Sequence, residues 1–265
     1  MTEGRTRIEV EGIPEFWDVV TAAEQRCLVL DYDGTLAPFR EDRMRAFPLE
    51  GIRELLIEIR DTGKTHLAMM TGRPLDELLA LLGDLDVPMS GSQGTEFRFP
   101  DGTTQTHLPD EVQESRLVRG EKEARALAPD YRVERKTASV AVHTRGMSEL
   151  DAARIQDALC GVWSADAEEH ELECRRFCGG LELRIKGIDK GTALRTLLNT
   201  REGKTLCVYV GDDDTDEDAF EVVREHGFGI KVGSQEDPTA ATGKLPGPEA
   251  VREFLIRWLA TTAGK

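Results

Sequence analysis

The sequence predicts an α/β fold in which a core built around a parallel sheet is interrupted by a smaller α+β unit. In the first hundred residues, and again after residue 190, short apolar runs alternate with helical patterns, as they do in βα units. Between these parts the apolar residues alternate with polar ones, which is typical of half-exposed antiparallel strands. We therefore expect residues 1–102 and 183–265 to form one core and residues 103–182 to form an inserted unit.

The first part of the core contains three expected strands, at residues 27–30, 65–70 and 87–90, and three expected helices, at residues 15–23, 49–62 and 75–82. Apolar residues three or four positions apart define one face of the second helix. Pro74 stands at a favoured early position of the third helix. The glycine-rich stretch 91–94 breaks the pattern and is predicted to act as a hinge.

In the insertion, Val133, Val140 and Val142 alternate with polar residues, and a helical stretch separates them from another strand at 181–185. The βα pattern then returns with a helix at 192–198, a strand at 206–210 and a final helix at 248–260. The stretch 233–247 is predicted to be a loop.

Composition limits the possible partners. Fifty acidic residues against 34 Lys and Arg give a net charge of −16, which repels nucleic acid and anionic membranes. The chain has no secretory signal pattern and no apolar stretch of about 20 residues, so we expect a cytoplasmic monomer that acts on a small molecule. Cys174 and Cys178 could bind a metal together with a second pair, but no such pair exists, and we interpret the five cysteines as reduced thiols.

Asp31 and Asp33 follow the first apolar strand directly, and Gly34 lets the chain turn after them. An Asp-x-Asp pair alone is more often part of a solvated turn. Here the pair lies at the carboxyl end of a buried strand, where open α/β sheets bind their ligands. We expect Asp31 to act as a nucleophile toward phosphorus and Asp33 to transfer protons to and from the leaving group and water.

Three further groups follow strands or begin helices of the core, and parallel strands would bring them to the same edge. Thr71 is expected to donate to a phosphoryl oxygen, with Gly72 and Arg73 beside it at the substrate. Lys190, with Lys186 as a rival, would supply positive charge. The acidic run 211–218 follows a strand, although such a run could also be a Ca²⁺-type loop or a solvated turn.

Electrostatics favours a metal ion at this edge. Two carboxylates about 4 Å apart repel each other by roughly 4 kcal/mol at an effective dielectric constant near 20. A hard divalent cation relieves this repulsion, and Mg²⁺ suits carboxylate, water and phosphate ligands. We assign it to Asp31, to Asp212 and to the backbone carbonyl of Asp33, with Asp213 as the alternative to Asp212. Asp213 and Asp216 are otherwise expected to support these ligands.

Taken together, these motifs resemble the haloacid-dehalogenase phosphatase superfamily, and more narrowly the trehalose-6-phosphate phosphatases. The resemblance rests on Asp31-Tyr32-Asp33-Gly34-Thr35-Leu36, Thr71-Gly72-Arg73, Asp189-Lys190-Gly191 and the run from Gly211 to Phe220, and it extends from about Cys27 to Leu259. It implies a Rossmann-like core, a C2-type cap formed by the insertion, Mg²⁺ as cofactor, and hydrolysis of trehalose 6-phosphate to trehalose and phosphate through an aspartyl-phosphate.

Strand periodicity places several polar residues of the insertion on one face of its sheet. On spacing alone, this face could simply be in contact with water. The resemblance favours sugar recognition instead, by Glu134, Lys136, His143, Glu182 and Arg184. The chain departs from the family pattern at Gln93, where the family often has His, and around residues 179–180, where the family often has Lys.

Three functions are compatible with these observations. The first is a Mg²⁺-dependent trehalose-6-phosphate phosphatase, and the second is a phosphatase for another sugar phosphate, such as sucrose phosphate or a glycosyl-glycerate phosphate. The third is a non-catalytic sugar-phosphate-binding module. We rank the third last because Asp31 and Asp33 are both present.

Overall fold

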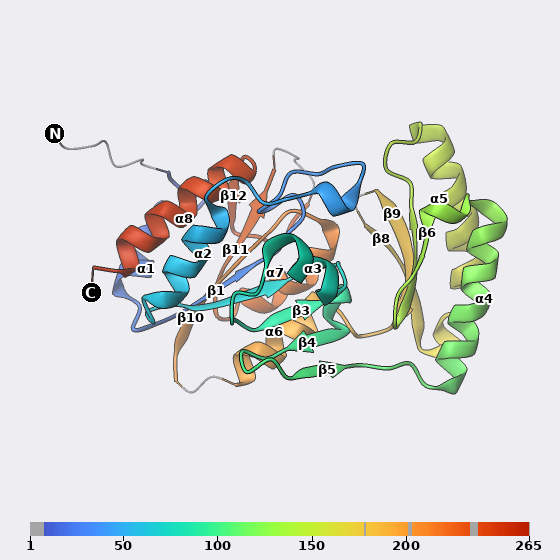
Figure 1. Ribbon diagram of the computed structural model, residues 1–265, viewed down its shortest axis with the longest axis horizontal. Helices are drawn as coiled ribbons and strands as arrows, with labels where there is room; N and C mark the ends of the chain where they lie inside the picture. The colour runs from blue at the N-terminus through green and yellow to red at the C-terminus, as the bar shows by residue number, and fades with distance from the viewer. Residues whose placement is uncertain (1–7, 178, 201–202, 234–237, 265) are drawn as a thin grey trace. The chain divides into compact units, whose positions relative to one another are not determined.

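The computed structural model describes residues 8–177, 179–200, 203–233 and 238–264 (Figure 1). The chain divides into two compact units. One unit comprises residues 1–104 and 190–265, and the other comprises residues 105–189. We call them the core and the cap and describe each by itself.

The core contains an eight-stranded sheet with the order β12-β11-β10-β1-β2-β3-β4-β5. Neighbouring strands from β12 to β3 are parallel, and β4 runs antiparallel to β3. The strands are β1 (Gln25–Leu30), β2 (His66–Met70), β3 (Met89–Gly91), β4 (Glu96–Arg98), β5 (Thr104–Thr106), β10 (Thr205–Gly211), β11 (Gly227–Val232) and β12 (Gly243–Leu245).

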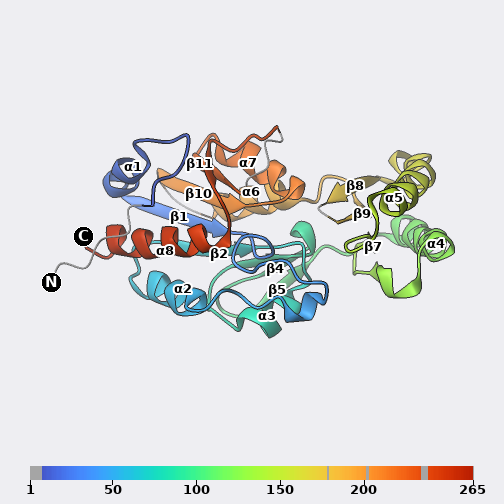
Figure 2. The same ribbon diagram turned by 90° about the horizontal axis from the view of Figure 1, so that it is seen from above.

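Helices cover both faces of this sheet (Figure 2). They are α1 (Phe16–Ala22), α2 (Ile52–Asp61), α3 (Leu75–Leu82), α6 (Lys190–Asn199), α7 (Glu217–Val223) and α8 (Pro248–Thr262). Leu28 and Leu30 of β1 belong to a hydrophobic cluster with residues of α1, α2, α3 and α8, whereas Cys27 and Val29 belong to a second cluster with residues of α6 and α7. Burial on both faces explains why β1 is a continuous apolar run rather than an alternating one.

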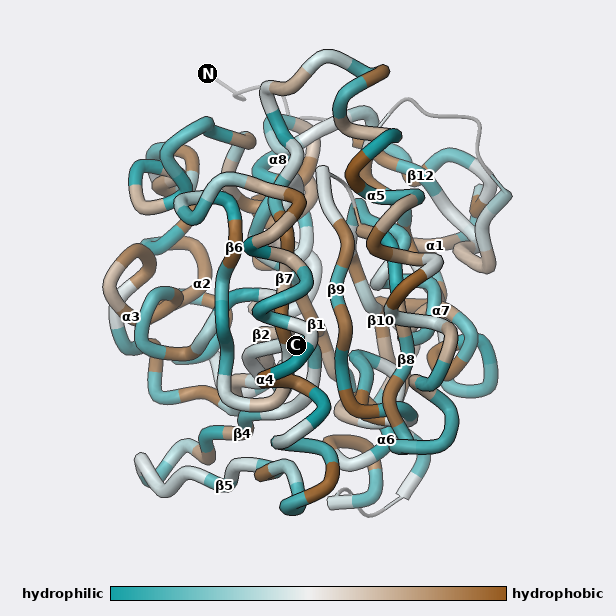
Figure 3. Tube along the Cα trace, turned by 90° about the vertical axis from the view of Figure 1, so that its right-hand side faces the viewer, coloured by the Kyte–Doolittle hydropathy of each residue, from teal (hydrophilic) through white to brown (hydrophobic). Residues whose placement is uncertain are grey.

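The cap contains an antiparallel sheet with the order β6-β7-β9-β8. Its strands are β6 (Val133–Arg135), β7 (Ser139–His143), β8 (Leu172–Phe177) and β9 (Gly180–Ile185), and its helices are α4 (Glu111–Leu127) and α5 (Glu149–Ser164). Both helices pack against this sheet. Hydrophobic and hydrophilic positions alternate along them (Figure 3), as expected for helices that bury one face.

Side-chain caps explain where the two cap helices begin. The Asp110 carboxylate accepts from the backbone N–H groups of Val112 and Gln113, while the Gln113 side chain accepts from the Asp110 N–H, which completes a capping box. At α5, the Ser148 hydroxyl accepts from the Asp151 N–H.

The predicted fold class, a parallel α/β core with a smaller α+β cap, is confirmed. The cap ends later than predicted, because β9 pairs along its length with β7 and β8, and the predicted boundary at 182/183 falls inside that strand. Within the predicted loop 233–247, residues 243–245 form β12, which extends the sheet beyond β11.

Two other expectations concern the chain as a whole. No helix among the described residues is long and apolar enough to cross a membrane. The four cysteines that the structure describes are free thiols, and Cys178 lies outside the described residues.

Candidate active site

The predicted site residues of the core follow three neighbouring strands or begin a helix. Asp31 follows β1, Thr71 follows β2 and Asp212 follows β10, while Lys190 is the first residue of α6. Because β2, β1 and β10 are adjacent and parallel, their carboxyl ends share one edge of the sheet.

Lys190 joins two carboxylates at the centre of this edge. Its Nζ lies 2.7 Å from Oδ1 of Asp31 and 2.7 Å from Oδ1 of Asp216, and all three side chains are buried. Burial raises the pKa of Asp31 to about 7, although the charge of Lys190 opposes that rise. The rival Lys186 lies in the cap, where it pairs with Glu168, so Lys190 is the lysine of this site.

Asp216 is saturated with donors. Its Oδ1 accepts from Lys190 and, at 2.6 Å, from the hydroxyl of Tyr209, while its Oδ2 accepts from the backbone N–H groups of Asp212 and Asp213 at 3.0 and 2.9 Å. Burial raises the pKa of the Tyr209 phenol, which therefore stays protonated and donates. Asp216 thus fixes both the lysine and the backbone of the loop after β10.

The acids at this edge fit a cation with oxygen ligands. One carboxylate oxygen each from Asp31, Asp212 and Asp216 lie within 4.8 Å of one another. Asp216 is occupied by its donors, but Oδ1 of Asp212 is buried without a hydrogen-bond partner among the described residues. A Cβ on Gly34, whose φ is +76°, would meet Oδ2 of Asp212 at 2.0 Å, so only glycine admits this carboxylate. Asp31 and Asp212 are therefore the residues that could hold a metal ion.

Asp213, the alternative metal ligand, uses its carboxylate to cap a helix instead. Its Oδ1 accepts from the backbone N–H of Asp214 at 2.6 Å and caps the short helix η5 (Asp214–Asp216). Its backbone carbonyl accepts from Lys231 at 3.0 Å. These contacts favour Asp212 over Asp213 as the metal ligand.

Asp33 is clamped by Arg73. Nε and Nη2 of the guanidinium donate to the two carboxylate oxygens at 2.6 and 2.7 Å, and the guanidinium also lies over the Tyr32 ring. Glu77 lies 3.4 Å from Nη1 of Arg73 and pairs in turn with Arg43. The predicted substrate-binding residue Arg73 therefore orients Asp33 in this structure.

The segment after β2 presents a hydroxyl beside a strained residue. Thr71 is buried, and its Oγ1 accepts from the Arg73 N–H at 3.2 Å, while no acceptor for its hydroxyl hydrogen is present among the described residues. A Cβ on Gly72 would meet Nε2 of Gln93 at 2.6 Å. Gln93 adopts a left-handed conformation with φ +57°, and its Oε1 is buried without a partner among the described residues. Backbone strain of this kind often marks functional positions.

The polar face predicted for the cap sheet is present and internally paired. Glu182 accepts from the Ser139 hydroxyl at 2.6 Å and from Lys136 at 3.1 Å. His143 lies 2.7 Å from Glu134, and Arg184 pairs with Glu173. Burial alone would raise the pKa of Glu182, but Lys136, the Ser139 hydroxyl and Arg184 together hold it below its usual range.

Sequence reasoning missed two residues that position the loop after β10. Tyr209 is one, and Lys231 of β11 is the other. Lys231 donates to the carbonyl of Asp213 and, at 3.2 Å, to Glu217, which also accepts from the Ala240 N–H. Both residues lie in buried strands, where strand periodicity signals burial but does not identify the partner of a side chain.

Comparisons with known proteins identify the family of this chain. The family model described as trehalose-phosphatase matches residues 29–248. The chain belongs to the trehalose-phosphatase family. It is 33% identical over 262 residues to the probable trehalose-phosphate phosphatase C of Arabidopsis thaliana, an alignment that covers 91% of this chain and 80% of that protein. The resemblance and the predicted class of enzyme, a phosphoric monoester hydrolase, are confirmed.

Solved structures confirm the fold. The C-terminal domain of the trehalose-6-phosphate phosphatase of C. albicans superposes with a TM-score of 0.85 at 20% identity, covering 96% of this chain and 99% of that one. A haloacid dehalogenase-like hydrolase of Bacteroides thetaiotaomicron superposes with a TM-score of 0.65 at 18% identity, covering 88% and 99% of the two chains. At these identities the likeness concerns the fold alone.

The saturation of Asp216 leads to a stability prediction. Tyr209→Phe removes a hydrogen bond to a buried carboxylate, whereas Tyr32→Phe, at an equally buried tyrosine, removes a bond to the carbonyl of Ala46. Bonds to charged groups contribute about 1.5–3 kcal/mol and neutral ones about 0.5–1.5 kcal/mol. Urea unfolding should therefore show a larger loss for Tyr209→Phe. Equal losses would contradict a special role of the Tyr209 hydroxyl at Asp216.

Proposed function

We propose that this protein is a Mg²⁺-dependent phosphatase that hydrolyses trehalose 6-phosphate to trehalose and phosphate. The observation that carries the proposal is the buried Asp31–Lys190–Asp216 cluster beside Asp212, in a chain of the trehalose-phosphatase family. We further propose that it acts in the cytoplasm as a monomer. Its net charge of −16 supports a small-molecule substrate rather than nucleic acid or a membrane.

In the proposed reaction, a carboxylate oxygen of Asp31 attacks the phosphorus atom and the bond from phosphorus to the sugar oxygen breaks. Asp33 donates a proton to the departing sugar oxygen and then takes one from the water that hydrolyses the aspartyl-phosphate. Lys190 balances the charge of Asp31, and the Thr71 hydroxyl would donate its hydrogen to a phosphoryl oxygen. Because both oxygens of Asp33 accept from Arg73, this pair must loosen before Asp33 can donate.

Mg²⁺ would be held by Asp31, Asp212 and the backbone carbonyl of Asp33. When bound, it would neutralise the clustered carboxylates and the phosphate charge. The orphaned Oδ1 of Asp212 and the glycine at position 34 support this assignment. Asp216 and Asp213 would support the ligands, since their carboxylates accept from the loop's own N–H groups.

We propose that the polar face of the cap sheet reads the sugar hydroxyls. Glu134, Lys136, His143, Glu182 and Arg184 supply both donors and acceptors, which hydroxyl groups require. In this structure these residues pair with one another or with neighbours of the same sheet. Sugar hydroxyls would either replace these partners or add hydrogen bonds to the paired groups. We also propose that Gly72 and Gln93 of the core contact the substrate, because the Gln93 Oε1 can accept from a hydroxyl.

A substrate panel tests the proposed function. Phosphate release is measured from trehalose 6-phosphate, sucrose 6-phosphate, glucose 6-phosphate and a glycosyl-glycerate phosphate, each with and without Mg²⁺. We expect Mg²⁺-dependent turnover with trehalose 6-phosphate preferred. Asp31→Asn should lower kcat by roughly a thousandfold or more, because an amide is a poor nucleophile.

Asp214→Asn is the matched control for this panel, since Asp214 is an exposed aspartate of the same acidic edge. It should retain near wild-type turnover. Preference for another sugar phosphate would replace the substrate assignment, and the absence of turnover on every substrate would favour a non-catalytic binding module.

Metal binding should depend on pH near neutrality. Since the pKa of Asp31 is about 7 without a cation, the metal must displace a proton from this carboxyl at lower pH. The apparent Mg²⁺ affinity should therefore fall by about tenfold from pH 8 to pH 6. Calorimetric titrations in buffers of different ionisation enthalpy would measure the released protons. Binding that releases no proton at pH 6 would contradict the assignment of Asp31 as a ligand.

A mutation in the cap should weaken sugar recognition without slowing the hydrolysis of a phosphate that carries no sugar. Glu182→Gln keeps the shape of the side chain but weakens its bonds to sugar hydroxyls, so kcat/KM for trehalose 6-phosphate should fall by roughly ten- to hundredfold. Hydrolysis of a small aryl phosphate should change little, because it has no hydroxyls to contact. Glu168→Gln, at an exposed cap glutamate, should affect neither substrate. Equal losses on both substrates for Glu182→Gln would assign it a structural role.

A further inference from the structure

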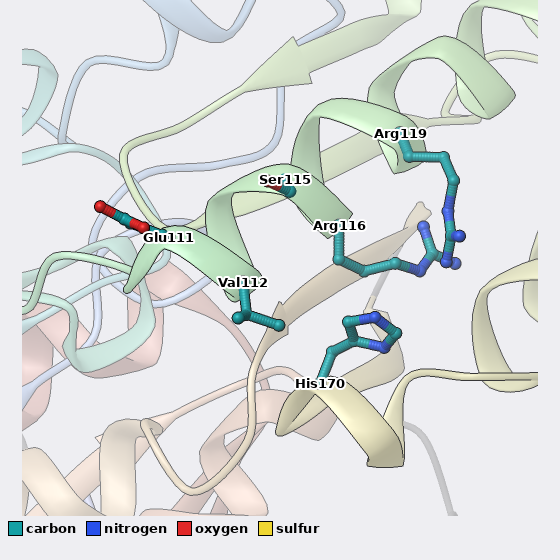
Figure 4. A pocket seen from close by; sticks show the side chains of 6 residues that line it. All are labelled: Glu111, Val112, Ser115, Arg116, Arg119 and His170. Atoms are coloured by element: carbon teal, nitrogen blue, oxygen red, sulfur yellow. The ribbon is translucent and has the colours of Figure 1, made fainter.

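The cap contains a pocket of about 390 Å³ that none of the proposed catalytic or sugar-binding residues lines. Its volume lies in the range of small-molecule sites. The lining residues come from helix α4 and from the short helix η4 (Glu168–His170), and they are Glu111, Val112, Ser115, Arg116, Arg119 and His170 (Figure 4).

Arg116 is the most informative of these residues, because its buried guanidinium is only partly satisfied. Its side chain is 1% exposed. Nε donates to Asp166 at 2.8 Å and Nη1 donates to Glu123 at 3.1 Å, whereas Nη2 is buried without a hydrogen-bond partner among the described residues. An unsatisfied buried donor costs about 1–3 kcal/mol, and more when it is charged, so an acceptor is expected here.

A second orphaned donor lies nearby. The indole Nε1 of Trp163 is also buried and has no partner in the described part of the chain. Nη1 of Arg116 and Nε1 of Trp163 lie 3.4 and 3.5 Å from the point that a Cβ on Gly120 would occupy, so the two side chains are neighbours. Neither group can accept a hydrogen bond. A water would bring two hydrogens that need acceptors of their own, whereas an oxyanion offers several acceptor oxygens.

Asp166 holds the groups of this pocket together. Its carboxylate accepts from both Arg116 and Arg119, and its backbone carbonyl lies 2.7 Å from Nδ1 of His170. Because a carbonyl can only accept, Nδ1 carries the hydrogen. In Figure 4 the two guanidinium groups lie side by side next to the imidazole, and the Glu111 carboxylate points away from them.

The charges of this cluster balance. Asp166 and Glu123 offset the two arginines, so an anion would be attracted by the geometry of the free donors rather than by excess positive charge. The two carboxylates hold the guanidinium of Arg116 in place through Nε and Nη1, which leaves Nη2 as its donor to an oxygen of phosphate or sulfate.

We propose that this pocket binds a small oxyanion, either inorganic phosphate or the phosphoryl group of a metabolite, between Arg116, Arg119 and Trp163. The proposal does not depend on the phosphatase function. It rests on the orphaned donor of Arg116, which lines the cavity, and on the orphaned indole N–H of Trp163, which neighbours Arg116.

The three tryptophans provide the test. In a ¹H–¹⁵N spectrum of the full chain, the indole N–H of Trp163 should shift as inorganic phosphate is added in the presence of EDTA. Trp17 and Trp258 donate to Ile8 and Thr65, so their indole signals serve as internal references. Trp163→Phe identifies the signal. Sulfate and glucose 6-phosphate should cause the same shift, while chloride should cause little.

Two variants of α4 locate the binding site. Arg119→Gln, at a residue that the proposed catalysis does not use, should weaken the phosphate response of Trp163 by about tenfold through the loss of one charge-assisted hydrogen bond. Arg125→Gln, also on α4 but paired with Glu121, should leave the response unchanged. A response to glucose 6-phosphate but not to inorganic phosphate would assign the site to a metabolite and would still support the proposal.

Three outcomes would overturn this proposal. One is a Trp163 signal that moves with neither inorganic phosphate nor glucose 6-phosphate, and another is an equal response to chloride. The third is a response that Arg119→Gln leaves intact, which would place the anion elsewhere.

Discussion

The crowding of carboxylates at one edge of the core sheet is the constraint on which the rest of the site depends. Asp31, Asp33, Asp212 and Asp216 follow neighbouring strands, and Asp31, Asp212 and Asp216, which each have a carboxylate oxygen within 4.8 Å of the others, would repel one another. Three of them have a cationic partner: Lys190 pairs with Asp31 and Asp216, and Arg73 pairs with Asp33. Among the described residues no such ion pair reaches Asp212. Asp212 is therefore the carboxylate of this group that lacks a cationic partner in the described part of the chain, and it is also a residue that the proposed metal would bind.

The same repulsion between carboxylates explains why so many hydrogen-bond donors surround Asp216 and hold the loop after β10. Asp216 tolerates complete burial only because a lysine, a phenol and two N–H groups donate to it. Lys231 ties the carbonyl of Asp213 to the next strand, and Gly34 makes room for the Asp212 carboxylate. The loop after β10 is thus held from several sides, so the Asp212 carboxylate is placed before any ligand arrives, which lowers the cost of binding one.

The sequence predicted those parts of the site that strand topology determines. Asp31, Thr71 and Asp212 could be grouped because parallel strands bring their carboxyl ends together. The partner of Arg73 could not be predicted, since a long side chain beside a substrate site can reach either the substrate or Asp33. β12 was missed because Gly243-Lys244-Leu245 is too short to show a period. The predicted cap boundary at 182/183 is wrong because it divides the predicted strand 181–185, which the structure keeps whole within β9 and pairs with β7 and β8.

The cap shows how one sheet can serve two purposes. Its helix-covered face is filled by apolar residues such as Val140, Leu181 and Leu183, which hold α4 and α5. Its other face carries charged residues that satisfy one another in pairs, as buried charges must. Pairing of this kind keeps the polar face stable without a ligand. If a sugar binds this face as proposed, it must offer at least equal hydrogen bonds to displace the existing ones. Selectivity in the proposed site would therefore arise less from affinity for any single hydroxyl than from the cost of breaking the Lys136–Glu182 pair without replacing it.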